Sequence, residues 1–253
     1  MNTLFVGQNA IHLTAVDSTN SYATEMLRQI APKEGTIIYT FEQTNGRGQR
    51  GNTWLSEPNK NVAFSLILHP SFLHADEQFL LTKITSLAVA DLMAEILKNA
   101  GSSAVVKIKW PNDIYVNDQK LGGILIENTI RENSIQYSVI GIGLNINQTA
   151  FNNSINATSV KTISGMETNL DGVVKRLCEF LEARYLQLKT NKRDHLDFSY
   201  LQRLYRLNEW KNYADETAAF EGKIVSVSAA GKLQLELLNG TMKEFDLKEI
   251  RFL

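Results

Sequence analysis

A glycine-rich segment that also carries two arginines is the clearest chemical feature of the sequence. Residues 46–51 are Gly-Arg-Gly-Gln-Arg-Gly, and Trp54 follows three residues later. Glycine lets the backbone approach a ligand closely, and the guanidinium groups of Arg47 and Arg50 suit carboxylate or phosphate. Trp54 adds a flat face for a purine. Together these residues predict a loop that closes over a small anion, with a flexible basic surface loop as the alternative. The spacing of the glycines fits neither the Walker nor the dinucleotide-binding pattern.

Three further regions place polar groups beside predicted elements. Residues 18–20 carry two hydroxyls and an amide at a predicted helix start, where they can cap the helix or bind a ligand with a urea or amide group. Residues 107–113 gather two lysines, an amide and a carboxylate at one end of an apolar strand. Residues 120–127 open a strand with a lysine and two glycines, and residues 141–147 repeat the small residues on the next strand. Each segment alone also fits a plain cap, turn or strand.

The hydrophobic pattern predicts the elements that must position these segments. Apolar residues at helical spacing predict the longest helix over residues 77–99, with others after residues 17–20 and over residues 170–189 and 193–207. Strands are predicted over residues 35–39, 62–68, 105–110, 114–116, 121–128 and 135–145. Short polar turns separate the last four of these strands, which favours an antiparallel meander.

Beyond Trp210 the sequence alternates apolar and polar residues. Strands are predicted over residues 222–228, 232–237, 241–246 and 249–252, with an Asn-Gly turn at residues 239–240. A unit of about 45 residues has too little core to be stable alone, so we expect it to pack on the larger part. The pattern predicts two domains, residues 1–208 and 209–253.

Composition excludes several kinds of site. The chain of 253 residues has a formal net charge of -1, which gives no overall attraction for nucleic acid. Cys178 is the single cysteine, which excludes an internal disulfide and a cysteine-based zinc site, and the four histidines are isolated. The sequence shows no signal peptide and no apolar run that would span a membrane, so it predicts a cytoplasmic protein.

In this order, the motifs resemble those of the biotin–protein ligases. The matching segments are residues 18–20, Gln43, residues 46–48 with Trp54, residues 109–113 (Lys-Trp-Pro-Asn-Asp), residues 120–125 (Lys-Leu-Gly-Gly-Ile-Leu) and residues 141–145 (Gly-Ile-Gly-Leu-Asn). The resemblance runs from about Asp17 into the C-terminal region. It implies an α+β fold, with a mixed, mainly antiparallel sheet packed with helices, similar to class II synthetases, and a small C-terminal SH3-like β-barrel.

The resemblance also implies an activity. Members of the family use MgATP to convert biotin to biotinyl-5′-AMP and then transfer biotin to one lysine of a biotin carboxyl carrier domain. By resemblance, the biotin-binding residues are Ser18, Thr19, Asn20, Gln43, Gly46, Arg47, Gly48, Lys120, Gly122 and Gly123. The ATP and adenylate residues are Arg47, Gln49, Arg50, Trp54, Asn112, Lys120 and Asn145.

The implied catalytic residues are Arg47, Lys120 and Asp113. Two anions must meet when biotin attacks the α-phosphorus, so the two cations would hold the carboxylate and the phosphate together. Asp113 would act on the incoming lysine, either as a base or as an electrostatic anchor. Mg²⁺ would be held mostly by phosphates, so no residue is assigned as a metal ligand.

The sequence departs from the family pattern at Gln49, where many relatives carry a second arginine. A neutral amide would retain the acyl-phosphate less by charge, although Arg50 can compensate. Only about sixteen residues precede Asp17, too few for the winged-helix domain of some relatives, so we expect no operator-DNA binding. The loop over residues 147–159 is either a segment that orders over the adenylate or a passive connector.

Two other functions fit the same fold class. A lipoate–protein ligase would need a long apolar tunnel, and a non-catalytic biotin-binding regulatory protein would not need Arg47, Lys120 and Asp113 together. An exposed sheet edge leaves the oligomeric state open between a monomer and a weak homodimer.

Overall fold

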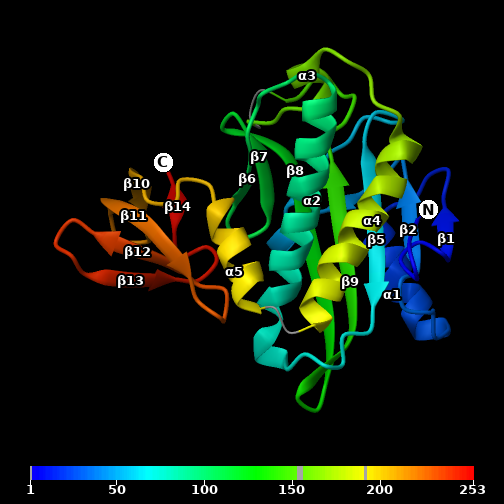
Figure 1. Ribbon diagram of the computed structural model, residues 1–253, viewed down its shortest axis with the longest axis horizontal. Helices are drawn as coiled ribbons and strands as arrows, with labels where there is room; N and C mark the ends of the chain where they lie inside the picture. Colours follow the sequence, from blue (N-terminus) through cyan, green and yellow to red (C-terminus); the bar gives the residue numbers. More distant parts are fainter. Residues whose placement is uncertain (1, 153–155, 191–192) are drawn as a thin grey trace.

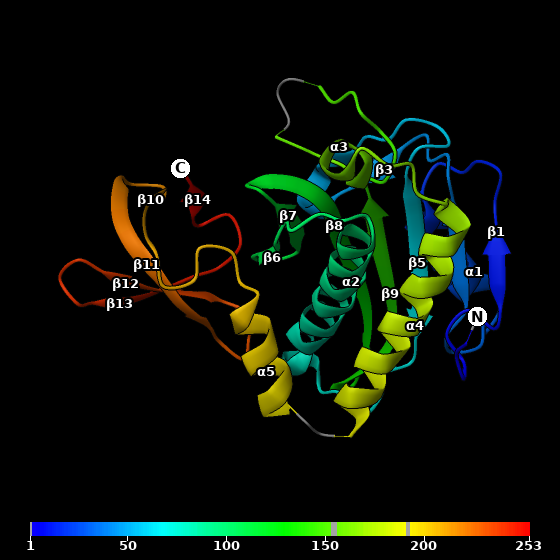
Figure 2. The same cartoon turned by 45° about the horizontal axis from the view of Figure 1, so that its top comes forward.

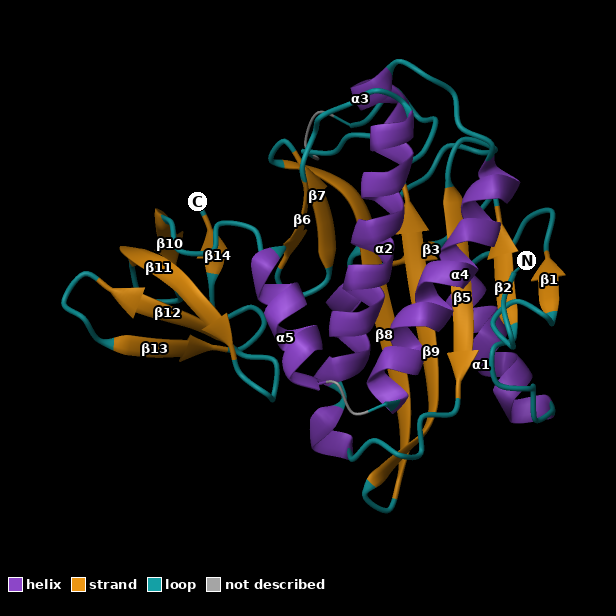
Figure 3. Cartoon of the chain, viewed as in Figure 1, coloured by secondary structure: helices purple, strands orange, loops and turns teal. Residues whose placement is uncertain are grey.

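The computed structural model describes residues 2–152, 156–190 and 193–253. A large sheet with helices on both faces forms most of the molecule, and a smaller all-β unit lies at one end (Figure 1). Figure 3 shows the same division by secondary structure. The α+β class, with a mainly antiparallel sheet, is as the sequence predicts.

The large sheet has seven strands in the order β1-β2-β5-β9-β8-β7-β6. Only β1 and β2 pair in parallel; every other neighbouring pair is antiparallel. The strands are β1 Ala10–His12, β2 Ile37–Thr40, β5 Val62–Leu68, β6 Val106–Lys109, β7 Asp113–Val116, β8 Gln119–Arg131 and β9 Ser134–Leu144. The predicted meander over residues 105–145 is confirmed.

Helices cover both faces of this sheet. On one face, α2 (Phe79–Asn99) and α4 (Leu170–Lys189) pack side by side, and α1 (Thr19–Gln29) packs on the other. Adjacent residues of β2 show this directly, because Ile37 belongs to the main core and Ile38 to a second cluster with Ala23 of α1. All seven residues of β5 are buried between these layers, which explains why this strand is almost continuously apolar.

The C-terminal unit is a five-stranded antiparallel sheet in the order β13-β12-β11-β10-β14. Its strands are β10 Trp210–Ala214, β11 Ala219–Val227, β12 Leu233–Leu237, β13 Met242–Phe245 and β14 Arg251–Phe252. It packs on the larger part as expected: Trp110 Nε1 donates to Gly231 O at 2.8 Å, and the Phe79 ring lies against the same glycine. In Figure 2, α5 (Arg193–Gln202) lies between this unit and α2.

The prediction was wrong about the end of α5, which stops at Gln202 rather than at residue 207. The backbone of Arg203 and Tyr205 instead hydrogen-bonds to Ile108 of β6, so tertiary pairing ends the helix. The pattern also missed β1, β10, the short helix α3 (Val160–Ser164) and the small hairpin of β3 (Gly46–Arg47) and β4 (Thr53–Trp54). Within the described residues, no helix is long and apolar enough to cross a membrane.

Candidate active site

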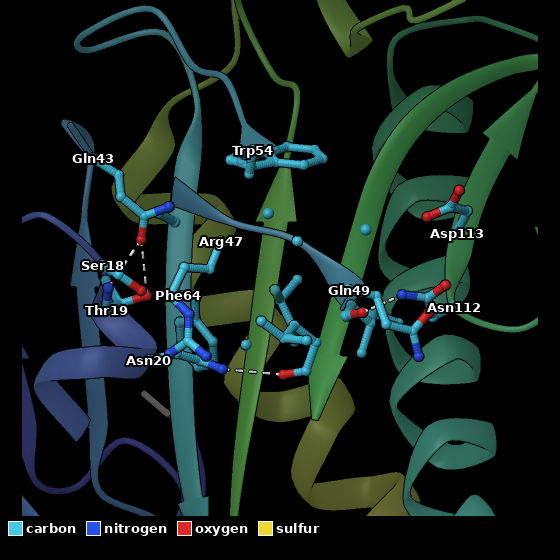
Figure 4. A pocket seen from close by; sticks show the side chains of 18 of the residues that line it. Ser18, Thr19, Asn20, Gln43, Arg47, Gln49, Trp54, Phe64, Asn112 and Asp113 are labelled. Carbon is cyan, nitrogen blue, oxygen red and sulfur yellow. Dashed lines mark hydrogen bonds between the residues drawn. The ribbon is translucent and has the colours of Figure 1, made fainter. Parts of the chain in front are cut away.

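A cavity of about 480 Å³, open to solvent, brings the predicted segments together (Figure 4). It lies where α1, the β3–β4 hairpin and strands β5, β9, β8 and β7 meet. Among the predicted residues, those that line it are Ser18, Thr19, Asn20, Gln43, Arg47, Gly48, Gln49, Trp54, Asn112, Asp113, Lys120 and Gly123. Segments up to about a hundred residues apart in sequence therefore share one site.

The start of α1 forms one end of the cavity, and its polar groups are already hydrogen-bonded. Ser18 caps α1 by accepting from Ser21 N at 3.3 Å, so the cap and the cavity wall are the same residue. The backbone N–H of Thr19 donates to Gln43 Oε1 at 2.9 Å. Residues 18–20 are all buried, and this end is therefore a fixed polar surface rather than a mobile one.

Asn20 forms the floor at this end. Ser65 Oγ of β5 lies 2.6 Å from Asn20 Oδ1 and 2.8 Å from Thr19 Oγ1. Asn20 Nδ2 donates to Glu127 Oε2 at 2.9 Å and to Leu125 O at 3.2 Å. The side chain fits because residue 141 is a glycine: a methyl group there would collide with the Asn20 amide.

The opposite wall is Trp54, held by the β3–β4 hairpin. A Cβ at Gly143 would lie only 2.5 Å from the indole ring, so the ring rests directly on the backbone of β9. The indole Nε1 is buried and has no hydrogen-bond partner among the described residues. The ring thus offers one face to the cavity and a donor without an internal acceptor.

Among the described side chains, two cations reach the cavity, and each is paired with a carboxylate. Lys120 Nζ lies 2.6 Å from Asp113 Oδ1, with the lysine side chain 29% exposed. Arg47 Nη2 lies 2.7 Å from Glu127 Oε1, with the arginine side chain 46% exposed. Partly exposed pairs of this kind contribute little to stability, so an entering anion can replace either carboxylate.

Buried polar groups beside Asp113 shape its surroundings. Lys109 stands directly across the β6–β7 pair from Asp113, and its Nζ donates to Tyr115 Oη at 3.2 Å. Burial lowers the pKa of Lys109, and the charge of Asp113 opposes that shift. Burial and then the negative charge of Asp113 raise the pKa of Tyr115 to about 12. Tyr115 therefore remains a neutral hydroxyl near neutral pH.

Asn112 joins the start of β7 to the interior of β8. Its side-chain Nδ2 donates to Ile124 O at 2.5 Å, and its backbone carbonyl accepts from Ile124 N at 3.0 Å. This pairing holds the turn between Lys109 and Asp113 against β8, and so sets where Asp113 meets Lys120.

Three of the predicted residues that the structure describes in full do not line this cavity. Gly46 and Gly122 pack behind it, against Trp54 and against the Gly143 carbonyl. Asn145 is buried, donates to Thr158 O at 3.1 Å, and keeps its Oδ1 without a partner within the described chain. For Arg50 the backbone is described, but the side chain lies outside the described part.

The loop over residues 147–159 is described only at its ends, because residues 153–155 lie outside the described residues. Its far end is fixed beside the cavity: Lys120 N donates to Asn156 O at 2.9 Å, and Thr158 N donates to Lys120 O at 2.9 Å. A change in this loop would therefore act directly on the backbone of Lys120.

Sequence reasoning missed Ser65 and Glu127 as parts of the site. Ser65 had a usable signal, since it is the one hydroxyl in the otherwise apolar strand of residues 62–68. Glu127 had a weaker signal, as the first charge after the apolar residues 124–126. No group of three or more His, Cys, Asp or Glu side chains that could hold a metal ion occurs in the residues that the structure describes.

Comparisons with known proteins agree with this geometry. The sequence pattern of the biotin/lipoate A/B protein ligase family matches residues 13–145. The bifunctional ligase/repressor BirA of Bacillus subtilis is 32% identical over 250 residues, covering 96% of this chain and 74% of that protein. The biotin–[acetyl-CoA-carboxylase] ligase of Paracoccus denitrificans is 33% identical over 136 residues, 53% of either chain.

Solved structures give the same result. The biotin protein ligase of Aquifex aeolicus in complex with biotin and ATP has a TM-score of 0.79 and 26% identity, covering 97% of this chain and 100% of that one. The Leishmania major biotin protein ligase in complex with biotinyl-5-AMP has a TM-score of 0.65 and 25% identity, covering 94% and 99%.

Proposed function

Because this chain belongs to the biotin/lipoate A/B protein ligase family, we propose that it is a biotin–protein ligase that joins biotin to a lysine of a carrier domain in two steps. The observation that carries the proposal is the pairing of a buried amide-and-hydroxyl surface with two exchangeable cations in one cavity. The buried polar surface suits the neutral ureido ring of biotin, and the two cations suit a carboxylate that must meet a phosphate.

In the first step, a carboxylate oxygen of biotin attacks the α-phosphorus of ATP. The bond from that phosphorus to the β-phosphate bridging oxygen breaks, and pyrophosphate leaves. Arg47 and Lys120 stabilise the charge that gathers between the two anions, which would otherwise repel each other. The nucleotide enters as MgATP, and we assign no residue of the chain to the metal.

In the second step, the lysine amine of the carrier attacks the acyl carbon. The bond from that carbon to the phosphate oxygen breaks, AMP leaves, and one proton is lost from the amine. We assign Asp113 to the incoming lysine, because its carboxylate lines the cavity beside Lys120, the cation that we assign to the phosphate. The carboxylate attracts the ammonium form and accepts its proton as the amine becomes nucleophilic.

A second cavity, of about 810 Å³, adjoins the first and shares Gln49, Asn112 and Ile124 with it. The amide side chains on its wall are Gln49, Gln78, Asn112 and Asn128. We propose this cavity, between the sheet and the C-terminal unit, as the approach of the carrier lysine, since neutral amides suit a peptide backbone better than a triphosphate. The acceptor is a carboxylase carrier domain.

The remaining assignments are proposals of the same kind. We take residues 1–208 as the catalytic domain and residues 209–253 as the SH3-like barrel domain, in a cytoplasmic protein. The chain is a monomer or a weak homodimer, and sedimentation across a concentration series decides between them. Absence of operator-DNA binding stays a prediction, which a salt-dependent gel shift tests.

One assay separates this function from its alternatives. Biotin-dependent exchange of pyrophosphate into ATP, followed by biotin transfer to a carrier domain, is expected here and should fail with lipoate. Exchange with lipoate would identify a lipoate ligase. Biotin binding without exchange would identify a non-catalytic binding protein.

A further inference from the structure

Glu127 joins the two chemically different halves of the site. One oxygen of its carboxylate accepts from Arg47 Nη2 at 2.7 Å, and the other accepts from Asn20 Nδ2 at 2.9 Å. Asn20 is 4% exposed and is fixed by Ser65. The carboxylate is therefore anchored on its buried side and holds a cation on its exposed side.

The pair holds the Arg47 guanidinium at the edge of the cavity in which the anions would meet. Arg47 borders both the main cavity and a neighbouring hollow of about 790 Å³ under residues 45–53, whereas Glu127 lines the hollow and not the main cavity. Figure 4 shows the Arg47 side chain extended toward Asn20 rather than toward Asp113. Within the described part of the chain, its other terminal nitrogen makes a single long contact, 3.4 Å to Ser21 Oγ.

We propose that Glu127 is a positioning residue that takes the place of the ligand's anion: it holds Arg47 when the cavity is empty and gives it up when a carboxylate or acyl-phosphate enters. This inference rests on the proposed function and deepens it. The pair is weak enough to exchange, because both side chains are substantially exposed, at 46% and 32%. Asn20 keeps the Glu127 carboxylate in place, so that Arg47 can return when the product leaves.

The exchange has a consequence for affinity. In the empty site the negative charge of Glu127 cancels the charge of Arg47, so each entering anion must first compete with it. Glu127→Gln keeps an oxygen for Asn20 and turns an amide donor toward Arg47, which frees the guanidinium. Biotin should then bind about two- to five-fold more tightly, and AMP should leave more slowly.

The test compares biotin with biotinol, its neutral alcohol analogue, by isothermal titration calorimetry. For Glu127→Gln we expect the gain with biotin and none with biotinol, and no gain when Arg47→Gln is also present. Glu25→Gln is the matched control, because Glu25 pairs with Arg28 on the exposed face of α1. Melting temperatures of the variants establish that the fold is kept.

Each outcome is decisive. Unchanged or weaker biotin binding by Glu127→Gln overturns the exchange, as does an equal gain for biotinol or a gain that survives Arg47→Gln. If the wild-type chain binds neither compound, the proposed function fails instead, and the two failures are told apart. Should Glu127→Gln not fold, Glu127→Asp provides the second measurement: its shorter side chain cannot hold both partners, and a biotin-specific gain is again required.

Discussion

The two halves of the cavity are built on different principles. At the end formed by α1, the side chains of Thr19, Asn20 and Ser65 are buried and bonded to one another. At the other end, Arg47 and Lys120 are partly exposed and bonded to carboxylates that a ligand can replace. The first end is prepared for one shape before any ligand arrives, whereas the second is prepared to change partners.

The difference follows from what each end must do. A neutral ring is recognised by hydrogen-bonding groups that lose little freedom on binding, which favours fixed and buried donors and acceptors. A reaction between two anions needs positive charge that follows the reacting atoms, which favours side chains with exchangeable partners. We therefore expect changes at the buried end to affect stability and affinity together, and changes at the charged end to affect the rate and the binding of anions with little effect on stability.

Lys120→Ala should give the largest effect. Removing this cation should lower biotin-dependent pyrophosphate exchange by about 100- to 1,000-fold. The free energy of unfolding should fall by less than about 1 kcal/mol, because the pair with Asp113 is partly exposed. Exchange kinetics and urea denaturation measure the two quantities. Lys107→Ala, on the edge strand β6, is the control. A loss of exchange under tenfold for Lys120→Ala would remove Lys120 from the reaction.

Asn20→Ala should affect stability and affinity together. Loss of the amide removes one hydrogen-bond partner each from Ser65 and Glu127 in a buried setting, which should cost about 1–3 kcal/mol of unfolding free energy. Biotin binding should weaken about tenfold or more. Calorimetry and denaturation should show both changes, while Asn45→Ala at the exposed rim shows neither. A stable Asn20→Ala protein with normal biotin affinity would contradict the proposed difference between the buried end and the charged end of the cavity.

Gly143→Ala tests the Trp54 wall. The added methyl would lie 2.5 Å from the indole ring, so the ring must move, and overpacking of this kind costs about 1–2 kcal/mol. Gly123→Ala is the matched comparison, because its methyl would meet the same ring at 3.4 Å, an ordinary contact. ATP affinity and tryptophan fluorescence should change more for Gly143→Ala. Equal effects from both variants would show that the contact with Gly143 does not position Trp54.

Gln49→Arg should give the smallest effect. It tests whether charge at this end of the cavity retains the reaction intermediate. Gln49 lines the cavity beside Arg47, so a second guanidinium should slow the escape of biotinyl-AMP by about two- to five-fold. Retention on a desalting column measures the escape rate, with Gln49→Met as a neutral control of similar length. Release at the wild-type rate would mean that charge at this position does not hold the intermediate.

The sequence predicted much of the fold because the long elements carry clear periodicity. The strand over residues 62–68 and the helix over residues 170–189 have the predicted bounds. The prediction failed at two kinds of place. Helix α5 ends early because residues after it pair with β6. The β3–β4 hairpin was missed because its strands are too short to show a hydrophobic pattern. For α5, local sequence could not contain that information, because its partner strand β6 lies far earlier in the chain.

The same distinction between local sequence and tertiary pairing applies to the site. The sequence alone determined which residue types were present and in what order, and the resemblance of these ordered motifs to those of the biotin–protein ligases indicated a ligase cavity. Only the tertiary structure decided which of them pair: that Glu127 holds Arg47 and Asn20, that Ser65 completes the polar floor, and that Asn145 lies behind the cavity. The physical reason is that charge pairing and burial depend on distances between strands β5, β8 and β9, which are fixed by packing and not by sequence spacing.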